Sequence, residues 1–253
     1  MRRWLLGVSV VLAAAGAAAA DDKAEAVVKK AIEAHGGADG LNKYKAARFT
    51  MKGEMAIMGM DVEISGDMAY VPDKFRMNIN LTIAGQQINV HQVVSGDKGK
   101  RTVKVGDQVV QDMKIEKDEV ALSRLGRQVE KLTPLLDAKQ FTLRAGDDED
   151  VNGKKAALVV VTPKGLDKEF KLYFDKESGL LVKSGHQGKG PGEGGAQVDA
   201  YQESYPSEYK KVNGVQVATK LVVQNDGKKF MTLNMSDVEL LEKLDDSEFK
   251  IDD

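Results

Sequence analysis

The sequence predicts a mainly β protein of the α+β class. We expect a large antiparallel, strongly curved half-open barrel of about ten strands, with an N-terminal helix and a mid-chain helix. Three observations predict this fold. Apolar and polar residues alternate with period two through most of the chain, which is typical of half-buried antiparallel strands. Asn-Gly and Asp-Gly pairs separate several of these segments, as in β-hairpins. Only two segments have the apolar spacing of a helix.

The first twenty residues predict export. Met1, Arg2 and Arg3 form a short basic start, an apolar stretch follows from Trp4, and Ala18-Ala19-Ala20 resembles a cleavage site. We therefore predict a cleaved signal peptide over 1–20 and a periplasmic protein. The mature chain has no run of about 18 apolar residues, so we expect no transmembrane span in it.

The remaining chain, residues 21–253, is predicted to be a single domain. It contains no cysteine, which excludes disulfides, thiolate nucleophiles and Cys-ligated metals. Loss of Arg2 and Arg3 leaves 35 basic residues of the original 37 against 39 acidic ones, a net charge of −4. No segment is strongly basic, so we expect no nucleic-acid partner.

Two helices are expected. Residues 21–35 begin with Asp21 and Asp22, where acidic side chains favour the helix dipole, and end before Gly36-Gly37. Residues 116–132 carry apolar side chains at helical spacing and are followed by Pro134.

The cleanest alternation runs from Phe75 to Ile83, where apolar residues take every second position. Tight turns are predicted at Asn152-Gly153, Asn213-Gly214 and Asp226-Gly227. Residues 185–195 include six glycines among eleven residues, which predicts a flexible loop.

The sequence contains no convergent catalytic set, so we expect a non-enzymatic protein without a cofactor. His35, His91 and His186 are widely separated and are interpreted as surface or interfacial residues. The segment DEDVNG, 148–153, begins like a calcium loop but has Val159 at the twelfth position, and is better interpreted as an acidic hairpin turn. The glycine-rich segment lacks the spacing of a P-loop.

Six of the ten methionines fall between positions 51 and 77. Met55, Met58 and Met60 permit Cu(I) binding, because soft thioethers suit that ion. Met51, Met55, Met68 and Met77 share their parity with apolar strand residues, which is consistent with a filled core. A third interpretation is a concave sheet whose flexible side chains adapt to an apolar ligand.

The order of elements resembles the periplasmic outer-membrane lipoprotein-sorting family, the LolA/LolB-like fold. The resemblance rests on the opening segment AIEAHGGADGLNKYKAARFTMKGEM, on VPDKFRMNINL, on LYFDKESGLLVK and on YKKVNGVQVATKLVV. It implies an incomplete antiparallel barrel around helices, with an apolar cavity for acyl chains. It also implies a lid-opening arginine on an early strand, for which Arg48 and Arg76 are candidates. The implied cavity residues are Met51, Met55, Ile64, Met68, Phe75, Met77, Ile79 and Leu81.

The leading hypothesis is therefore an exported protein that binds a lipid or lipoprotein acyl group in an apolar cavity, with a role in outer-membrane lipoprotein sorting. A membrane-associated protein is a further partner to be considered. The first alternative is a structural or protein-interaction module with a filled core. The lesser alternative is methionine-based copper binding; we expect no other metal site.

Overall fold

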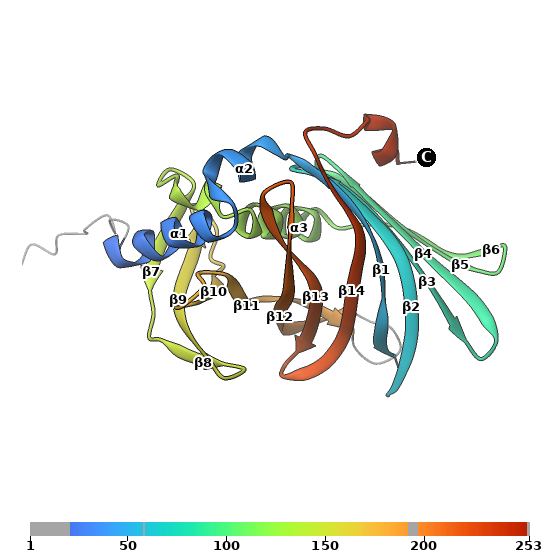
Figure 1. Cartoon of the computed structure of the whole chain (residues 1–253). Helices are drawn as coiled ribbons and strands as arrows, with labels where there is room; N and C mark the ends of the chain where they lie inside the picture. The colour runs from blue at the N-terminus through green and yellow to red at the C-terminus, as the bar shows by residue number, and fades with distance from the viewer. Residues whose placement is uncertain (1–20, 58, 192–196, 252–253) are drawn as a thin grey trace, which may run out of the picture.

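One antiparallel sheet contains fourteen strands in the computed structural model, which describes residues 21–57, 59–191 and 197–251 (Figure 1). The predicted signal peptide and Met58 lie outside the described residues. The strands are β1 (Ala46–Ile57), β2 (Met60–Val71), β3 (Lys74–Ile83), β4 (Gln86–Ser95), β5 (Lys98–Val105), β6 (Gln108–Lys114), β7 (Phe141–Ala145), β8 (Glu149–Val151), β9 (Lys154–Pro163), β10 (Phe170–Asp175), β11 (Leu181–Pro191), β12 (Gln197–Val212), β13 (Val215–Asn225) and β14 (Lys228–Leu241).

The strand order is β6-β5-β4-β3-β2-β1-β14-β13-β12-β11-β10-β9-β7, with β8 paired to β9. Most neighbours in the sheet are also neighbours in sequence, which confirms the expected meander. There are two exceptions: β7 pairs with β9, and β1 pairs with β14, where Met51 lies opposite Met235. The second is the long-range one. This pairing joins the two halves of the chain into one sheet.

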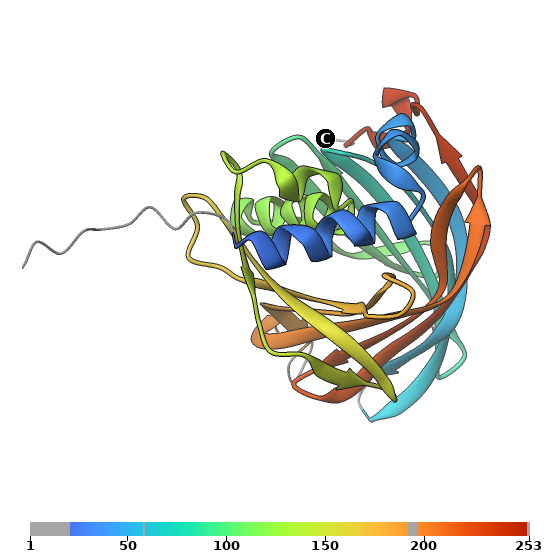
Figure 2. The ribbon, with the colours of Figure 1, turned by 60° about the vertical axis from the view of Figure 1, so that its left-hand side comes forward.

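The sheet is open, because its edge strands β6 and β7 do not pair with each other. It bends past the helices without curling strongly (Figure 2). The expected strongly curved half-barrel of about ten strands is therefore corrected to an open sheet of fourteen strands. The chain passes from edge strand β6 to edge strand β7 through a helical segment, so these two strands are not joined by a hairpin that would pair them.

The two expected helices are confirmed as α1 (Asp22–Ala34) and α3 (Lys117–Glu130). The side chain of Asp21 caps α1 by accepting a hydrogen bond from the backbone N–H of Lys23. A short helix, α2 (Gly37–Lys43), was not expected. It begins after Gly36, whose φ of 123° turns the chain in a way that only glycine adopts readily. None of the helices in the described residues has the length and apolar character needed to cross a bilayer.

Helices α1 and α3 lie against one face of the sheet, which we call the inner face (Figures 1 and 2). Buried residues of α1 pack there with strands β7, β9 and β10 in the largest apolar core. Its fully or nearly fully buried members include Val28, Ala31, Val159, Val161 and Leu172. Because β9 alternates, Val160 points the other way and belongs to a separate cluster with Tyr173.

The hairpin turns occur where the sequence predicts them. Asn152 and Gly153 both have positive φ, as do Asn213 with Gly214 and Asp226 with Gly227. The acidic segment 148–153 is thus the β8–β9 hairpin and not a calcium loop.

The prediction that residues 185–195 form a loop is wrong for 185–191, the part of this segment that the structure describes. Residues up to Pro191 belong to β11 and pair with β12, while 192–196 lie outside the described residues. A Cβ at Gly185 would lie 2.4 Å from the hydroxyl of Tyr201, and one at Gly190 would lie 3.0 Å from the Cβ of Ala200. These glycines therefore leave room for side chains of the neighbouring strand, a tertiary requirement that composition does not reveal.

Candidate ligand-binding surface

Strand pairing places the eight predicted cavity residues on the inner face of β1, β2 and β3. Met68 lies opposite Met77, Ile64 opposite Leu81, and Gly66 connects Met51 to Ile79 across β2. Directly paired residues of antiparallel strands point to the same side, so these pairs form successive rows. The parity read from the sequence is therefore confirmed at these positions.

The eight residues differ in exposure. Met51, Ile64, Phe75, Ile79 and Leu81 are buried, with Met51 only 3% and Leu81 9% exposed. Met55, Met68 and Met77 are only partly buried. The fold thus brings the set together, but five of its members already pack against protein. Contact between any of the eight and a ligand stays a prediction.

Seven of the eight belong to a larger set, which we call the inner apolar cluster. All its members come from strands, and nine of them are only partly buried. Its members are Met51, Val62, Ile64, Ile79, Leu81 and Leu233, with Met55, Ile57, Met68, Met77, Ile83, Ile88, Val90, Leu221 and Met231 packed against them. No helical residue contributes to the inner apolar cluster, in contrast to the cluster around α1.

A second cluster continues this surface beneath α3. Phe75 packs with Val94, Ile115 and Val120, the last of these on α3. Met68 and Met77 pack against both this cluster and the inner apolar cluster. The apolar surface is therefore continuous along β3, from helix-covered Phe75 to helix-free Leu81.

Arg127 of α3 lies over this surface. Its guanidinium carbon is 4.7 Å from the centroid of the Phe75 ring. The Nε and Nη2 atoms are buried and have no hydrogen-bond partner among the described residues. Sequence analysis missed Arg127, although a signal existed: it lies seven residues after Val120, on the apolar stripe of the helix.

The groups near Arg127 have shifted pKa values. Burial lowers the pKa of Arg127 itself, and nearby Glu130 partly offsets this. Burial also raises the pKa of Glu130 and raises that of Tyr70 to about 12. Glu130 is nevertheless exposed to solvent.

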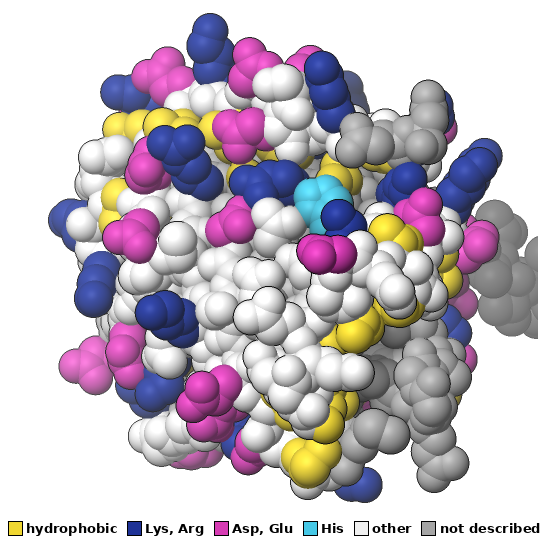
Figure 3. Space-filling model, turned by 90° about the vertical axis from the view of Figure 1, so that its right-hand side faces the viewer, with side chains coloured by type: hydrophobic (Ala, Val, Ile, Leu, Met, Phe, Trp, Pro, Cys, Tyr) yellow, Lys and Arg dark blue, Asp and Glu magenta, His cyan; other side chains and the backbone are white. Residues whose placement is uncertain are grey.

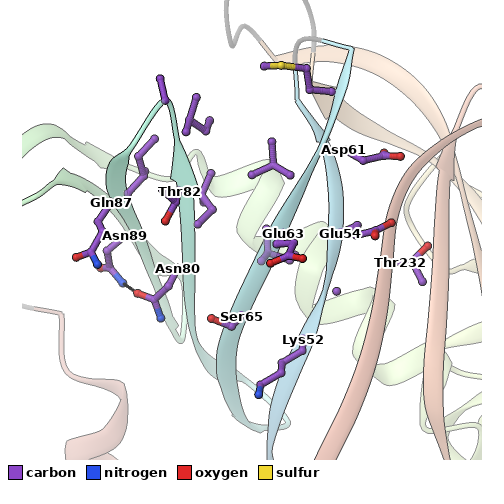
Figure 4. A pocket seen from close by; sticks show the side chains of 18 of the residues that line it. Lys52, Glu54, Asp61, Glu63, Ser65, Asn80, Thr82, Gln87, Asn89 and Thr232 are labelled. Atoms are coloured by element: carbon purple, nitrogen blue, oxygen red, sulfur yellow. Dashed lines mark hydrogen bonds between the residues drawn. The ribbon is translucent and has the colours of Figure 1, made fainter.

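On the opposite, outer face, most side chains of β1 to β4 are polar. A hollow of about 1200 Å³ lies on it between β14 and the β3–β4 hairpin, and Figure 4 shows α3 behind the strands that line it. Glu63, Ser65 and Asn80 point into the hollow, and Asn89 donates a hydrogen bond of 2.9 Å to Asn80. Of the eight predicted residues, only Ile64 and Leu81 border this hollow. It is therefore not the expected apolar cavity.

Figure 3 shows the side of the molecule that carries β2 to β6, where uncharged polar surface is interspersed with charges of both signs. The two candidate lid arginines lie on this outer face. Arg48 pairs with Glu239 at 2.9 Å, and Arg76 pairs with Asp67 at 2.5 Å. Asn78 donates to the same Asp67. Neither arginine shares the parity of the inner apolar cluster, so neither is oriented toward the predicted cavity.

Met55 and Met60 of the predicted copper set lie on the paired strands β1 and β2. Met55 is partly buried in the inner apolar cluster, Met60 is 54% exposed, and Met58 lies outside the described residues. Residues 21–57, 59–191 and 197–251 contain no group of three or more His, Cys, Asp or Glu that could hold a metal.

The three histidines lie on different elements and do not form a site. His35 is buried at the end of α1, where Nδ1 is 2.7 Å from the carbonyl oxygen of Ala31. His186 stacks on Phe170 in the sheet, and burial lowers the pKa of both histidines. His91 lies 2.5 Å from the side-chain oxygen of Asn78 on the outer face.

Comparison with solved structures identifies the architecture. The structure aligns with a DUF1329 family protein from Desulfovibrio piger at a TM-score of 0.53, with 14% identity, over 90% of this chain and 97% of the other. It aligns with an outer membrane lipoprotein-sorting protein domain from Vibrio parahaemolyticus at a TM-score of 0.52, with 13% identity, over 90% and 96% of the two chains. A LolA superfamily protein from Nitrosomonas europaea gives 0.50, with 12% identity, over 90% and 97%.

The chain has a LolA-like fold. This confirms the resemblance that the sequence motifs carry. No protein-family model and no curated protein sequence matches the chain. At 12–14% identity the LolA-like structures establish the fold, whereas the ligand must be argued from the residues of this chain.

Proposed function

We propose that residues 21–253 form a single LolA-like domain, built on the open sheet, that binds an acyl chain of a lipid or lipoprotein against the inner apolar cluster. In this proposal the protein is periplasmic and non-enzymatic, and it serves outer-membrane lipoprotein sorting. One observation carries the proposal: nine apolar side chains of the inner apolar cluster remain partly exposed, and no helical residue contributes to that cluster.

The driving force would be burial of apolar surface. Each methylene withdrawn from water contributes about 0.8 kcal/mol, so a long acyl chain supplies ample free energy even after the cost of ordering it. Met55, Met68 and Met77 are suited to this role, because unbranched thioether side chains adjust to the shape of an apolar partner. The similarity of the fold to a lipoprotein-sorting domain supports the same class of ligand.

A specific observation favours the alternative, a structural or protein-interaction module with a filled core. Met51, Phe75 and three other predicted cavity residues are already buried without a ligand. A fully packed surface of this kind would offer an acyl chain only the partly exposed positions.

Native mass spectrometry of the protein purified from its own cells distinguishes the two functions. We expect a bound species with the mass of an acyl lipid or lipopeptide, and uptake of a fluorescent fatty acid once that species is removed. Ligand-free protein that also takes up no fluorescent fatty acid would contradict acyl binding and favour the filled core.

A further inference from the structure

Arg127 differs from every other arginine in the described part of the chain. Arg48, Arg76 and Arg101 pair with carboxylates at 2.9, 2.5 and 2.7 Å. Arg124 donates to the carbonyl oxygen of Gly96, and the remaining arginine of the set lies near Glu169. Arg127 has two buried nitrogens without a hydrogen-bond partner.

Unpartnered buried donors are unfavourable, because the hydrogen bonds that they made to water are lost. Arginine is also a poor choice for filling space, since its guanidinium stays charged and presents five donors. Glu130 lies three residues further along α3 and its charge acts on Arg127, yet Nε and Nη2 of Arg127 still have no hydrogen-bond partner. A donor set that the protein itself leaves unsatisfied is available to an external acceptor.

The position of Arg127 defines what that acceptor would be attached to. The guanidinium covers Phe75, and Phe75 begins the continuous apolar surface that passes through Met68 and Met77 to Leu81. Leu81 is six positions after Phe75 along the strand, which is roughly 20 Å at about 3.3 Å per residue. The surface therefore has a cation at its helix-covered end and apolar side chains along the rest of its length.

We propose that Arg127 binds the anionic headgroup, a carboxylate or phosphate, of an amphiphile whose acyl chain lies along the inner apolar cluster. This inference rests on the proposed acyl-binding function and names its ligand class. A planar guanidinium binds either oxyanion through paired hydrogen bonds, and burial strengthens such bonds. The Phe75 ring holds the guanidinium in place when no ligand is present.

The test compares three ligands with the same sixteen-carbon chain: hexadecanoic acid, hexadecyl phosphate and hexadecanol. Charge-assisted hydrogen bonds predict that the wild-type protein binds at least one of the two anions about 10- to 100-fold more tightly than the neutral alcohol. Arg127→Gln should lose this preference while its affinity for hexadecanol is unchanged, and Arg127→Lys should retain part of it.

Arg124→Gln is the matched control, because Arg124 lies on the same helix but already has a backbone acceptor. It should keep the wild-type preference. Affinity for hexadecanol also shows that each variant retains its folded apolar surface.

The outcomes separate the inference from the function on which it rests. Equal binding of all three ligands by the wild-type protein overturns the role of Arg127 and leaves acyl binding intact. If Arg127→Gln still prefers the anions, the role of Arg127 is likewise overturned and acyl binding is left intact. Failure of the wild-type protein to bind any of the three overturns acyl binding and the headgroup site together. Arg127-dependent binding of inorganic phosphate alone, with no amphiphile bound, would show a free-anion site and overturn the proposed ligand class.

Discussion

The guanidinium of Arg127 lies 4.7 Å from the centroid of the Phe75 ring, while two of its nitrogens stay without a hydrogen-bond partner. The cation–π contact with the ring stabilises the fold by about 0.5–2 kcal/mol. The unsatisfied buried donors destabilise it by about 1–3 kcal/mol. We therefore expect Arg127→Met to unfold at the wild-type temperature or up to about 4 °C higher in ligand-free protein. Thermal unfolding followed by circular dichroism measures this. A decrease of more than about 4 °C would show that Arg127 stabilises the fold.

Met77 contributes to both apolar clusters and is partly buried. If it lines a ligand surface, Met77→Gln should lower the affinity for a fluorescent fatty acid about tenfold, because the amide must be desolvated beneath the chain. Its melting temperature should change little. Thr82→Gln, on the outer face of the same strand, is the control and should leave the affinity unchanged. A large loss of stability in Met77→Gln, with no ligand bound by the wild-type protein, would favour the filled core.

Burial lowers the pKa of His35 below its value in the unfolded chain, about 6.5. The neutral imidazole is therefore favoured in the folded state, and the unfolded state binds more protons near pH 6. The stabilising contribution is present above pH 6.5 and is lost as the pH falls toward the lowered value. We expect the urea concentration at the unfolding midpoint to decrease when the pH is lowered from 7.5 to 5.5. The decrease should be smaller in His35→Gln.

The lowered pKa of His186 also makes the folded state less stable as the pH falls. The raised pKa of Glu130 has the opposite effect on stability. Comparison of wild type with His35→Gln at each pH removes both contributions. The double variant His35→Gln/His186→Gln should show a still smaller dependence. If the urea midpoint of the wild type and of both variants depends on pH in the same way, the histidines are not the source of that dependence.

Gly66 and Gly126 predict opposite effects of the same substitution. A Cβ at Gly66 would lie 1.9 Å from the carbonyl oxygen of Asn78, so Gly66→Ala must separate β2 from β3. We expect it to lower the free energy of unfolding by about 1–3 kcal/mol or more. A Cβ at Gly126 meets nothing within 4 Å, and Gly126→Ala in helix α3 should raise that free energy by about 0.5–1 kcal/mol. Urea denaturation measures both, and equal effects would show that the close approach at Gly66 is not limiting.

Local patterns were sufficient to predict much of the fold. The period-two alternation from Phe75 to Leu81 gave the correct inner face, because the side-chain period of a strand depends only on its backbone geometry. The cap at Asp21 and the turn at Asn213-Gly214 were also predictable, since each rests on interactions within a few residues. The same local pattern could not count the strands correctly.

The sequence by itself thus determined the strand parity, two helices and the grouping of the eight inner residues. Only the tertiary structure decided that β1 pairs with β14, that the glycines before Pro191 pair as a strand, and that Arg127 lies unpartnered over Phe75. The physical reason is that each of these depends on contacts between residues far apart in the chain. Such contacts follow from how whole elements pack, whereas periodicity and turn chemistry report only on neighbours in sequence.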